Sequence, residues 1–212
     1  MKKCFTTFGL IALVTVSNYV FCQSGHGLEK LSLDGNWEVI FDDKNLGVIE
    51  KWYLKKNYDT HPSKQIISVP SALELTSKDY EGVALYRKKF LIPDDWNDQI
   101  IEVHFEAVNY KAELWLNDEV VGFHEGGYTP FSFRIDKLLK MGEENQLVVR
   151  VITPIILTDK NIDGLGRQEV PMWRGAINGG IWQSVSLSRK ASINLKDVFL
   201  EPNIKSKSLE VN

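Results

Sequence analysis

The stretch LWLNDEVVGFHEGGYTPFSF, residues 114–133, decides the fold. On both sides of a central loop, apolar and polar residues alternate with the period of two that is typical of half-buried β-strands. Asn117 and Asp118 mark one turn, and the pair Gly126-Gly127 marks another. The stretch therefore predicts antiparallel strands that are joined by turns.

The loop inside this stretch has two interpretations. In the first it is a corner of the scaffold, where the glycines let the backbone turn between two sheets and Tyr128 and Phe131 plug the end of the structure. In the second it is the rim of a binding pocket, to which His124 and Glu125 offer hydrogen bonds and Tyr128 offers an aromatic face. The sequence favours the scaffold interpretation.

The same alternation continues from Leu31 through most of the chain. The run 31–41 places Leu31, Leu33, Trp37, Val39 and Phe41 on one face. The inward residues of the later strands are Ile101, Val103, Phe105, Ala107, Ala112, Leu114, Leu116, Leu147, Val149, Val151, Ile181, Val185 and Leu187. One short helix is expected over 137–141, because Asp136 is a good N-cap and Gly142 a good helix stop. Many short strands without a strand–helix–strand rhythm predict an all-β fold, an antiparallel jelly-roll β-sandwich with one short helix.

Three tryptophans are assigned from this pattern. Trp115 lies on the polar face of its predicted strand, between the inward-facing Leu114 and Leu116. It could be a platform for a sugar ring or part of an interface with another domain. Trp37 and Trp182 are expected in the core.

The composition excludes several classes of function. The 212 residues are 43% hydrophobic and 25% charged, with a formal net charge of −3 and no run of lysine and arginine, so neither nucleic acid nor a membrane surface is an expected partner. The cysteines are Cys4 and Cys22, both at the N-terminal end, which leaves the rest of the chain without thiol chemistry. The four histidines are scattered singly. We therefore expect no metal site and no cofactor.

The N-terminus predicts export. Met1-Lys2-Lys3 is a short basic start, and the apolar run 8–21 is too short and too interrupted for a transmembrane helix, so residues 1–22 are predicted to be a signal peptide. Cleavage after Cys22 would leave Gln23 first and send the protein to the periplasm or the extracellular space. Alternatively, Cys22 is the lipid-anchored cysteine of a bacterial lipoprotein. The chain is exported in both cases.

A second candidate site is the stretch TPIILTDKNIDGLGRQEVPMWR, residues 153–174. It lacks the alternation of a β-strand, and it is long for a loop that only connects two strands. Long loops of this kind often carry functional residues. Its residues suit a sugar, because tryptophan stacks on the apolar face of a pyranose while carboxylates and arginine bind hydroxyls; they are Asp163, Arg167, Glu169, Trp173 and Arg174. The alternative is a mobile loop with solvated charges.

Four segments in order carry a family resemblance. They are LDGNWEVIFDD at 33–43, YEGVALYRKKF at 80–90, LNDEVVGFHEGGYTPFSFRIDKLLKMGEENQLVVRV at 116–151 and MWRGAINGGIWQSVSL at 172–187. Together they resemble the N-terminal sugar-binding domain of glycoside hydrolase family 2, which includes β-galactosidases, β-glucuronidases and β-mannosidases. The resemblance implies a sugar-binding β-sandwich domain over residues 23–202. It also implies that residues 203–212 begin an immunoglobulin-like second domain, so the chain is expected to be truncated.

The resemblance also implies a function. In this family both catalytic carboxyl groups lie on a (β/α)₈ barrel of about 250 residues, so no catalytic residue is expected in this chain. The expected partners are a β-glycoside and the missing domains of the same polypeptide. Val170-Pro171 stand where β-galactosidases carry an acidic residue that helps to hold the sugar and a cation, so galactose is not implied. The alternatives are a free-standing carbohydrate-binding module or an inactive fragment.

Overall fold

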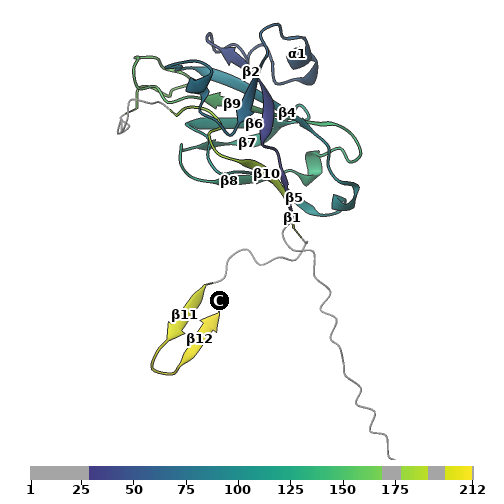
Figure 1. Cartoon of the computed structure of the whole chain (residues 1–212), viewed down its shortest axis with the longest axis vertical. Helices are drawn as coiled ribbons and strands as arrows, with labels where there is room; N and C mark the ends of the chain where they lie inside the picture. Colours follow the sequence, from purple (N-terminus) through teal and green to yellow (C-terminus); the bar gives the residue numbers. More distant parts are fainter. Residues whose placement is uncertain (1–28, 169–177, 191–198, 212) are drawn as a thin grey trace, which may run out of the picture.

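The computed structural model describes residues 29–168, 178–190 and 199–211. Its main body is a sandwich of two antiparallel sheets (Figure 1), which confirms the predicted fold class. The six-stranded sheet has the order β3-β2-β4-β9-β6-β7, with bounds Gln65–Val69, Gly35–Asp42, Val83–Phe90, Asn145–Ile152, Lys111–Leu116 and Glu119–Glu125. The four-stranded sheet has the order β1-β10-β5-β8, with bounds Glu29–Ser32, Val185–Lys190, Ile100–Phe105 and Phe131–Arg134.

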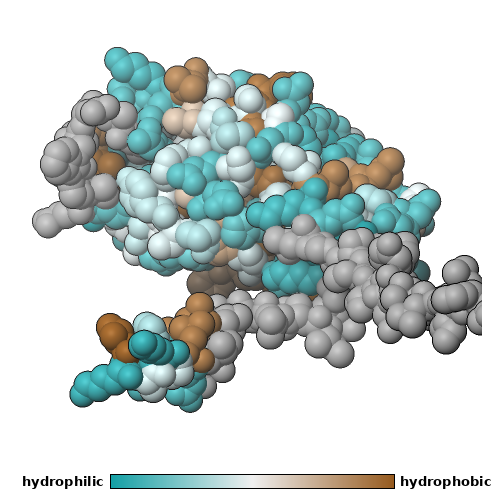
Figure 2. All heavy atoms as spheres, turned by 60° about the horizontal axis from the view of Figure 1, so that its bottom comes forward, coloured by the Kyte–Doolittle hydropathy of each residue, from teal (hydrophilic) through white to brown (hydrophobic). Residues whose placement is uncertain are grey.

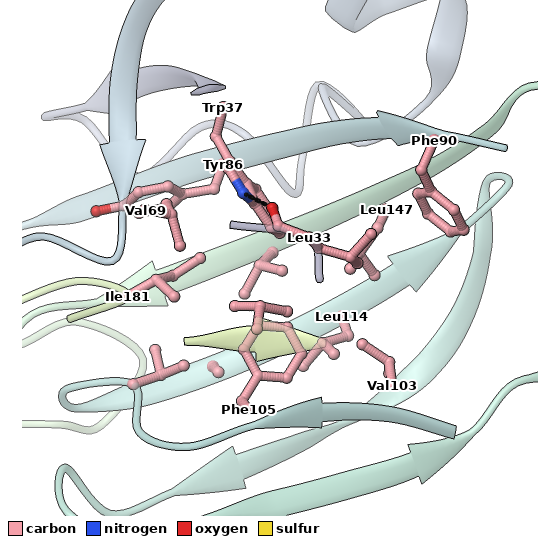
Figure 3. Close-up of a cluster of buried hydrophobic side chains, with 14 of the residues drawn as sticks. Leu33, Trp37, Val69, Tyr86, Phe90, Val103, Phe105, Leu114, Leu147 and Ile181 are labelled. Carbon is pink, nitrogen blue, oxygen red and sulfur yellow. Dashed lines mark hydrogen bonds between the residues drawn. The ribbon is translucent and has the colours of Figure 1, made fainter. Parts of the chain in front are cut away.

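The core between the two sheets includes most of the residues that the alternation placed inward (Figure 3). All the inward residues predicted in the segments 101–107, 112–116, 147–151 and 181–187 are fully buried. Trp37 lies among them as predicted, and its indole N–H donates a hydrogen bond of 2.8 Å to the carbonyl oxygen of Leu33. Period-two alternation located the core correctly because each of these strands turns one face to the opposite sheet.

The residues that the run 31–41 places on one face all contribute to the core, but the run is not one strand. The run divides into β1, in the four-stranded sheet, and β2, in the six-stranded sheet. Between them Asp34 accepts a hydrogen bond of 2.8 Å from the backbone N–H of Val185, and Gly35 has a φ of +98°. The chain therefore crosses from one sheet to the other at a glycine without interrupting the alternation.

The predicted helix over 137–141 is a single 3₁₀ turn, η3, Asp136–Leu138. Its N-cap position is held by Ile135, and the carboxylate of Asp136 is instead bound by the guanidinium of Arg134 at 2.6 and 3.1 Å. The α-helix is elsewhere, at α1, Lys55–Thr60. Two further 3₁₀ turns are η1, Leu73–Leu75, and η2, Asp94–Trp96.

A third layer covers the outer face of the six-stranded sheet. Its centre is a second apolar cluster to which the sheet contributes Ile40, Val83, Leu85, Trp115, Val148 and Ile152, and the covering segments contribute Trp52, Tyr53, Tyr58, Ile155, Ile162 and Leu165. Trp115 is 7% exposed and stacks on Tyr53, with ring centroids 4.8 Å apart. The interpretation of Trp115 as a sugar platform or an interface with another domain is therefore wrong, because its own chain covers it.

Residues 199–211 form a separate hairpin of β11, Leu200–Asn203, and β12, Ser208–Val211. The predicted domain boundary after Pro202 falls within β11. Apolar side chains lie on the surface of this hairpin (Figure 2), where Leu200, Ile204 and Leu209 are each more than half exposed. Among the described residues, no helix is long and apolar enough to cross a membrane.

Candidate functional site

The loop after β7 is held at one end of the sandwich by its glycines. Gly126 has a φ of +133°, which favours glycine. At Gly127 a Cβ atom would lie 2.2 Å from Oδ1 of Asn109, so only glycine fits against this side chain. Asn109 in turn exchanges backbone hydrogen bonds of 2.9 and 2.7 Å with Gly180. The loop and the segment beginning at Asn178 are thus joined through one buried asparagine.

Phe131 and His124 act as parts of the scaffold. The half-buried ring of Phe131 lies parallel to Phe105 on one side and to His124 on the other, with centroids 5.0 and 4.2 Å away. Nε2 of His124 lies 3.2 Å from the hydroxyl oxygen of Thr129. The scaffold interpretation of Phe131 agrees with this arrangement. His124 closes the stack and turns an imidazole nitrogen toward the loop.

Tyr128 does not plug the end of the sandwich, because it is 63% exposed. Its ring lies against Trp182, with centroids 5.6 Å apart and an angle of 70° between the planes. Trp182 is half-buried rather than in the core as predicted, and its indole N–H donates a hydrogen bond of 2.9 Å to the carbonyl oxygen of Gly127. The two side chains form an aromatic corner at the surface, and we use this name for the pair below.

Glu125 is the last residue of β7, directly opposite Lys111 of β6, and is exposed. Burial and the neighbouring Glu125 carboxylate, which accepts a hydrogen bond from the hydroxyl of Tyr110, raise the pKa of Tyr110. The backbone N–H of Gly126 donates to the carbonyl oxygen of Tyr110 at 3.0 Å. This part of the rim therefore presents a carboxylate and a phenol in fixed positions.

The second candidate stretch is anchored by a buried carboxylate that the sequence did not single out. Glu81 is 3% exposed, and its carboxylate accepts backbone hydrogen bonds from Ile156, Leu157 and Thr158 as well as the hydroxyl of Thr158. Nζ of Lys160 binds the carbonyl oxygen of Glu81. Burial raises the pKa of Glu81, but these hydrogen bonds lower it by more, so the net shift is downward. The start of the stretch is thus a fixed structure rather than a mobile loop.

Asp163 lies on the outer face of the six-stranded sheet and is already paired. Its carboxylate accepts hydrogen bonds from Arg150 at 2.5 Å and from Asn45 at 2.9 Å. Burial raises the pKa of Asp163, and the bonds from Asn45 and Arg150 lower it by more. The guanidinium of Arg150 also binds Glu113 at 2.7 Å and is itself buried. The geometry gives Asp163 a role in holding the third layer.

Of the other four candidate binding residues in this stretch, the structure describes one. Arg167 is exposed, and its guanidinium lies 3.6 Å from the carboxylate of Asp159, which is more exposed still. Glu169, Trp173 and Arg174 lie outside the described residues. The structure therefore places His124 against Phe131, Tyr128 against Trp182 and Glu125 against Tyr110. Asp163 belongs to a different set of contacts, with Arg150 and Asn45.

Sequence reasoning missed two residues of this end of the sandwich, Trp182 and Asn109. Trp182 follows the glycine pair Gly179-Gly180, which marks a turn rather than a strand, and this was the available signal for a position at the surface. Asn109 gives no local signal, because its role depends on contacts with residues 18 and 71 positions away. Among the described residues, no group of three or more His, Cys, Asp or Glu side chains could hold a metal ion.

Comparisons with known proteins bear on what such a site could bind. The family model "Glycosyl hydrolases family 2, sugar binding domain" matches residues 30–191. A β-galactosidase of Thermoanaerobacter pseudethanolicus is 28% identical over 172 residues, which are 79% of this chain and 20% of that protein. A β-glucuronidase of Bacteroides fragilis is 27% identical over 151 residues, 70% of this chain and 19% of that protein.

Solved structures show the same fold. The β-glucuronidase of Ruminococcus gnavus, in complex with D-glucaro 1,5-lactone, superposes with a TM-score of 0.70 at 23% identity, covering 85% of this chain and 32% of that one. A β-glucuronidase of an uncultured Clostridium species gives the same TM-score and identity over 89% of this chain and 34% of that one. The chain thus spans about a fifth of the curated relatives and a third of the solved chains that it matches.

Proposed function

Because the chain belongs to glycosyl hydrolase family 2, whose sugar binding domain it forms, we propose that it works as the non-catalytic part of a longer exported β-glycosidase. In that protein it would shape one side of the substrate pocket while a separate domain hydrolyses terminal β-glycosidic bonds. The observation that carries the proposal is the match over residues 30–191 to a domain that makes up about a fifth of the related β-galactosidases and β-glucuronidases.

We propose the loop end of the sandwich as the surface that meets the sugar. His124, Glu125 and Tyr128 are in or next to this loop, whereas the carboxylate of Asp163 is occupied by Arg150 and Asn45. Arg167, Glu169, Trp173 and Arg174 belong to the stretch that leads back to this end at Asn178, and we retain them as candidate contacts. The polar groups of this surface suit hydroxyls, and its aromatic side chain suits the C–H face of a pyranose.

The test compares the native protein that contains this sequence with the 212-residue chain alone. The native protein is isolated with an antibody to the sandwich, and hydrolysis of 4-nitrophenyl β-galactoside and β-glucuronide is measured for both. We expect hydrolysis of a β-glycoside by the native protein and none by the chain. Hydrolysis by the chain itself would refute the non-catalytic role. An inactive native protein of the same mass as the chain, which still binds sugar, would favour a free-standing binding module.

We also propose that residues 1–22 direct export and are removed. The basic start, the short apolar run and Cys22 support this proposal. Mass spectrometry of the mature protein is expected to find Gln23 at its N-terminus, whereas a lipid-modified Cys22 would identify a lipoprotein. A cytoplasmic protein that retains Met1 would contradict both the cleaved signal peptide and the lipoprotein.

A further inference from the structure

We propose that the aromatic corner of Tyr128 and Trp182 is a preformed binding site for a pyranose ring. This inference rests on the proposed function, and it identifies the two side chains that hold the sugar at the loop end. Trp182 was expected in the core, and its position at the surface is a finding of the structure alone.

The first argument is exposure. Tyr128 is among the most exposed aromatic residues of the sandwich, at 63%, although a large apolar ring in water is unfavourable. Its ring meets Trp182 at 70°, so the two planes form a corner rather than a flat stack. A pyranose has one face of C–H groups and a periphery of hydroxyls. A corner of two rings can cover that face while the hydroxyls stay in reach of polar neighbours.

The second argument is rigidity. The indole N–H of Trp182 binds the carbonyl oxygen of Gly127, the residue before Tyr128, at 2.9 Å. Gly127 packs on the side chain of Asn109, and Nδ2 of Asn109 donates to the carbonyl oxygen of Asn178 at 3.1 Å. The backbone on both sides of the corner is therefore fixed before any ligand arrives. A preformed site loses little conformational entropy on binding, which matters for a ligand as small as one sugar ring.

The third argument concerns polar groups in the same loop. The hydroxyl of Thr129, the residue after Tyr128, and Nε2 of His124 form a hydrogen-bonding pair. These groups can bind sugar hydroxyls as donors and acceptors. The loop therefore offers polar partners for the hydroxyls of a pyranose whose C–H face lies on the aromatic rings.

The experiment is an NMR titration of the 212-residue chain with methyl β-D-galactopyranoside, which follows the indole N–H signal of Trp182. That signal, one of six tryptophans, is assigned by its loss in Trp182→Phe. We expect it to shift with saturation, and we expect Tyr128→Ala to weaken binding about tenfold while Tyr128→Phe keeps it within about threefold. Phe123→Ala is the matched control, because Phe123 is 67% exposed on β7, the strand that leads into the loop, and should not matter.

Methyl β-D-glucopyranoside is titrated in the same way as a second sugar. No saturable shift with either sugar, undiminished binding by a folded Tyr128→Ala variant, or an equal loss in Phe123→Ala would overturn the inference. These failures are distinct from failure of the proposed function, because β-glycoside hydrolysis by the native protein would stand if the corner bound nothing.

Discussion

At the scale of the residue, the ionised carboxylate of Glu81 holds the backbone at the start of the second candidate stretch in place. Its folded-state pKa is lowered, so its contribution to stability is present above the ordinary glutamate pKa and is lost as the pH falls through the folded pKa. We expect Glu81→Gln to lower the free energy of unfolding by about 1 to 3 kcal/mol at neutral pH and to flatten its acid dependence. Urea unfolding from pH 7 to pH 3 measures both. Glu119→Gln, at an exposed position, is the control.

Arg150 is the second residue that decides a local structure. Its buried guanidinium binds Glu113, Asp163 and Asn45. Arg150→Met therefore removes the ion-pair partner of Asp163 and leaves Glu113 with Lys111 alone. Both carboxylates are partly solvated, and we therefore expect a loss of about 2 to 3 kcal/mol, less than for a fully buried pair. The exposed Arg167→Met should change stability by less than about 0.5 kcal/mol. If chemical denaturation gives the two variants equal stability, Arg150 does not hold the third layer.

At the scale of the element, the third layer depends on Trp115. Trp115→Ala removes the ring on which Tyr53 stacks, and we expect it to lower the free energy of unfolding by about 3 to 5 kcal/mol and to free the segment 43–60. Trypsin should then cut at Lys51, Lys55 or Lys56 much faster than in the unchanged chain. Phe123→Ala, at an exposed position on the same sheet, should alter neither property. Equal trypsin resistance of both variants would contradict this role of Trp115.

The same layer shows why sequence patterns predicted one face of the six-stranded sheet and not the other. The inward residues of β9 alternate with Val148, Arg150 and Ile152, which are also buried. An arginine on an alternating strand indicates a solvent-facing side, and no local signal shows that distant carboxylates will neutralise it. For a similar reason the loop end was only half predicted. The composition of the loop suggested Tyr128 as a residue that contacts a ligand. Its neighbour Trp182 lies 54 positions away in the sequence, and only the folded structure brings the two rings together.

At the scale of the whole molecule, the hairpin of β11 and β12 forms a sheet of its own and is not part of the sandwich. A two-stranded hairpin is marginally stable in water, and this one has Leu200, Ile204 and Leu209 more than half exposed. We propose that it begins an immunoglobulin-like domain in a longer polypeptide, where those side chains would be buried. In the 212-residue chain we therefore expect amides of 200–211 to exchange with solvent far faster than those of β9.

Deletion of residues 199–212 tests the same idea through stability. If the hairpin belongs to another domain, its removal should shift the melting temperature of the sandwich by less than about 2 °C, because no core contact is lost. A fall of more than about 4 °C, or slow exchange of the hairpin amides in the 212-residue chain, would show instead that the hairpin packs on the sandwich. The exposed leucines would then be covered within this chain, and they would give no support to a further domain.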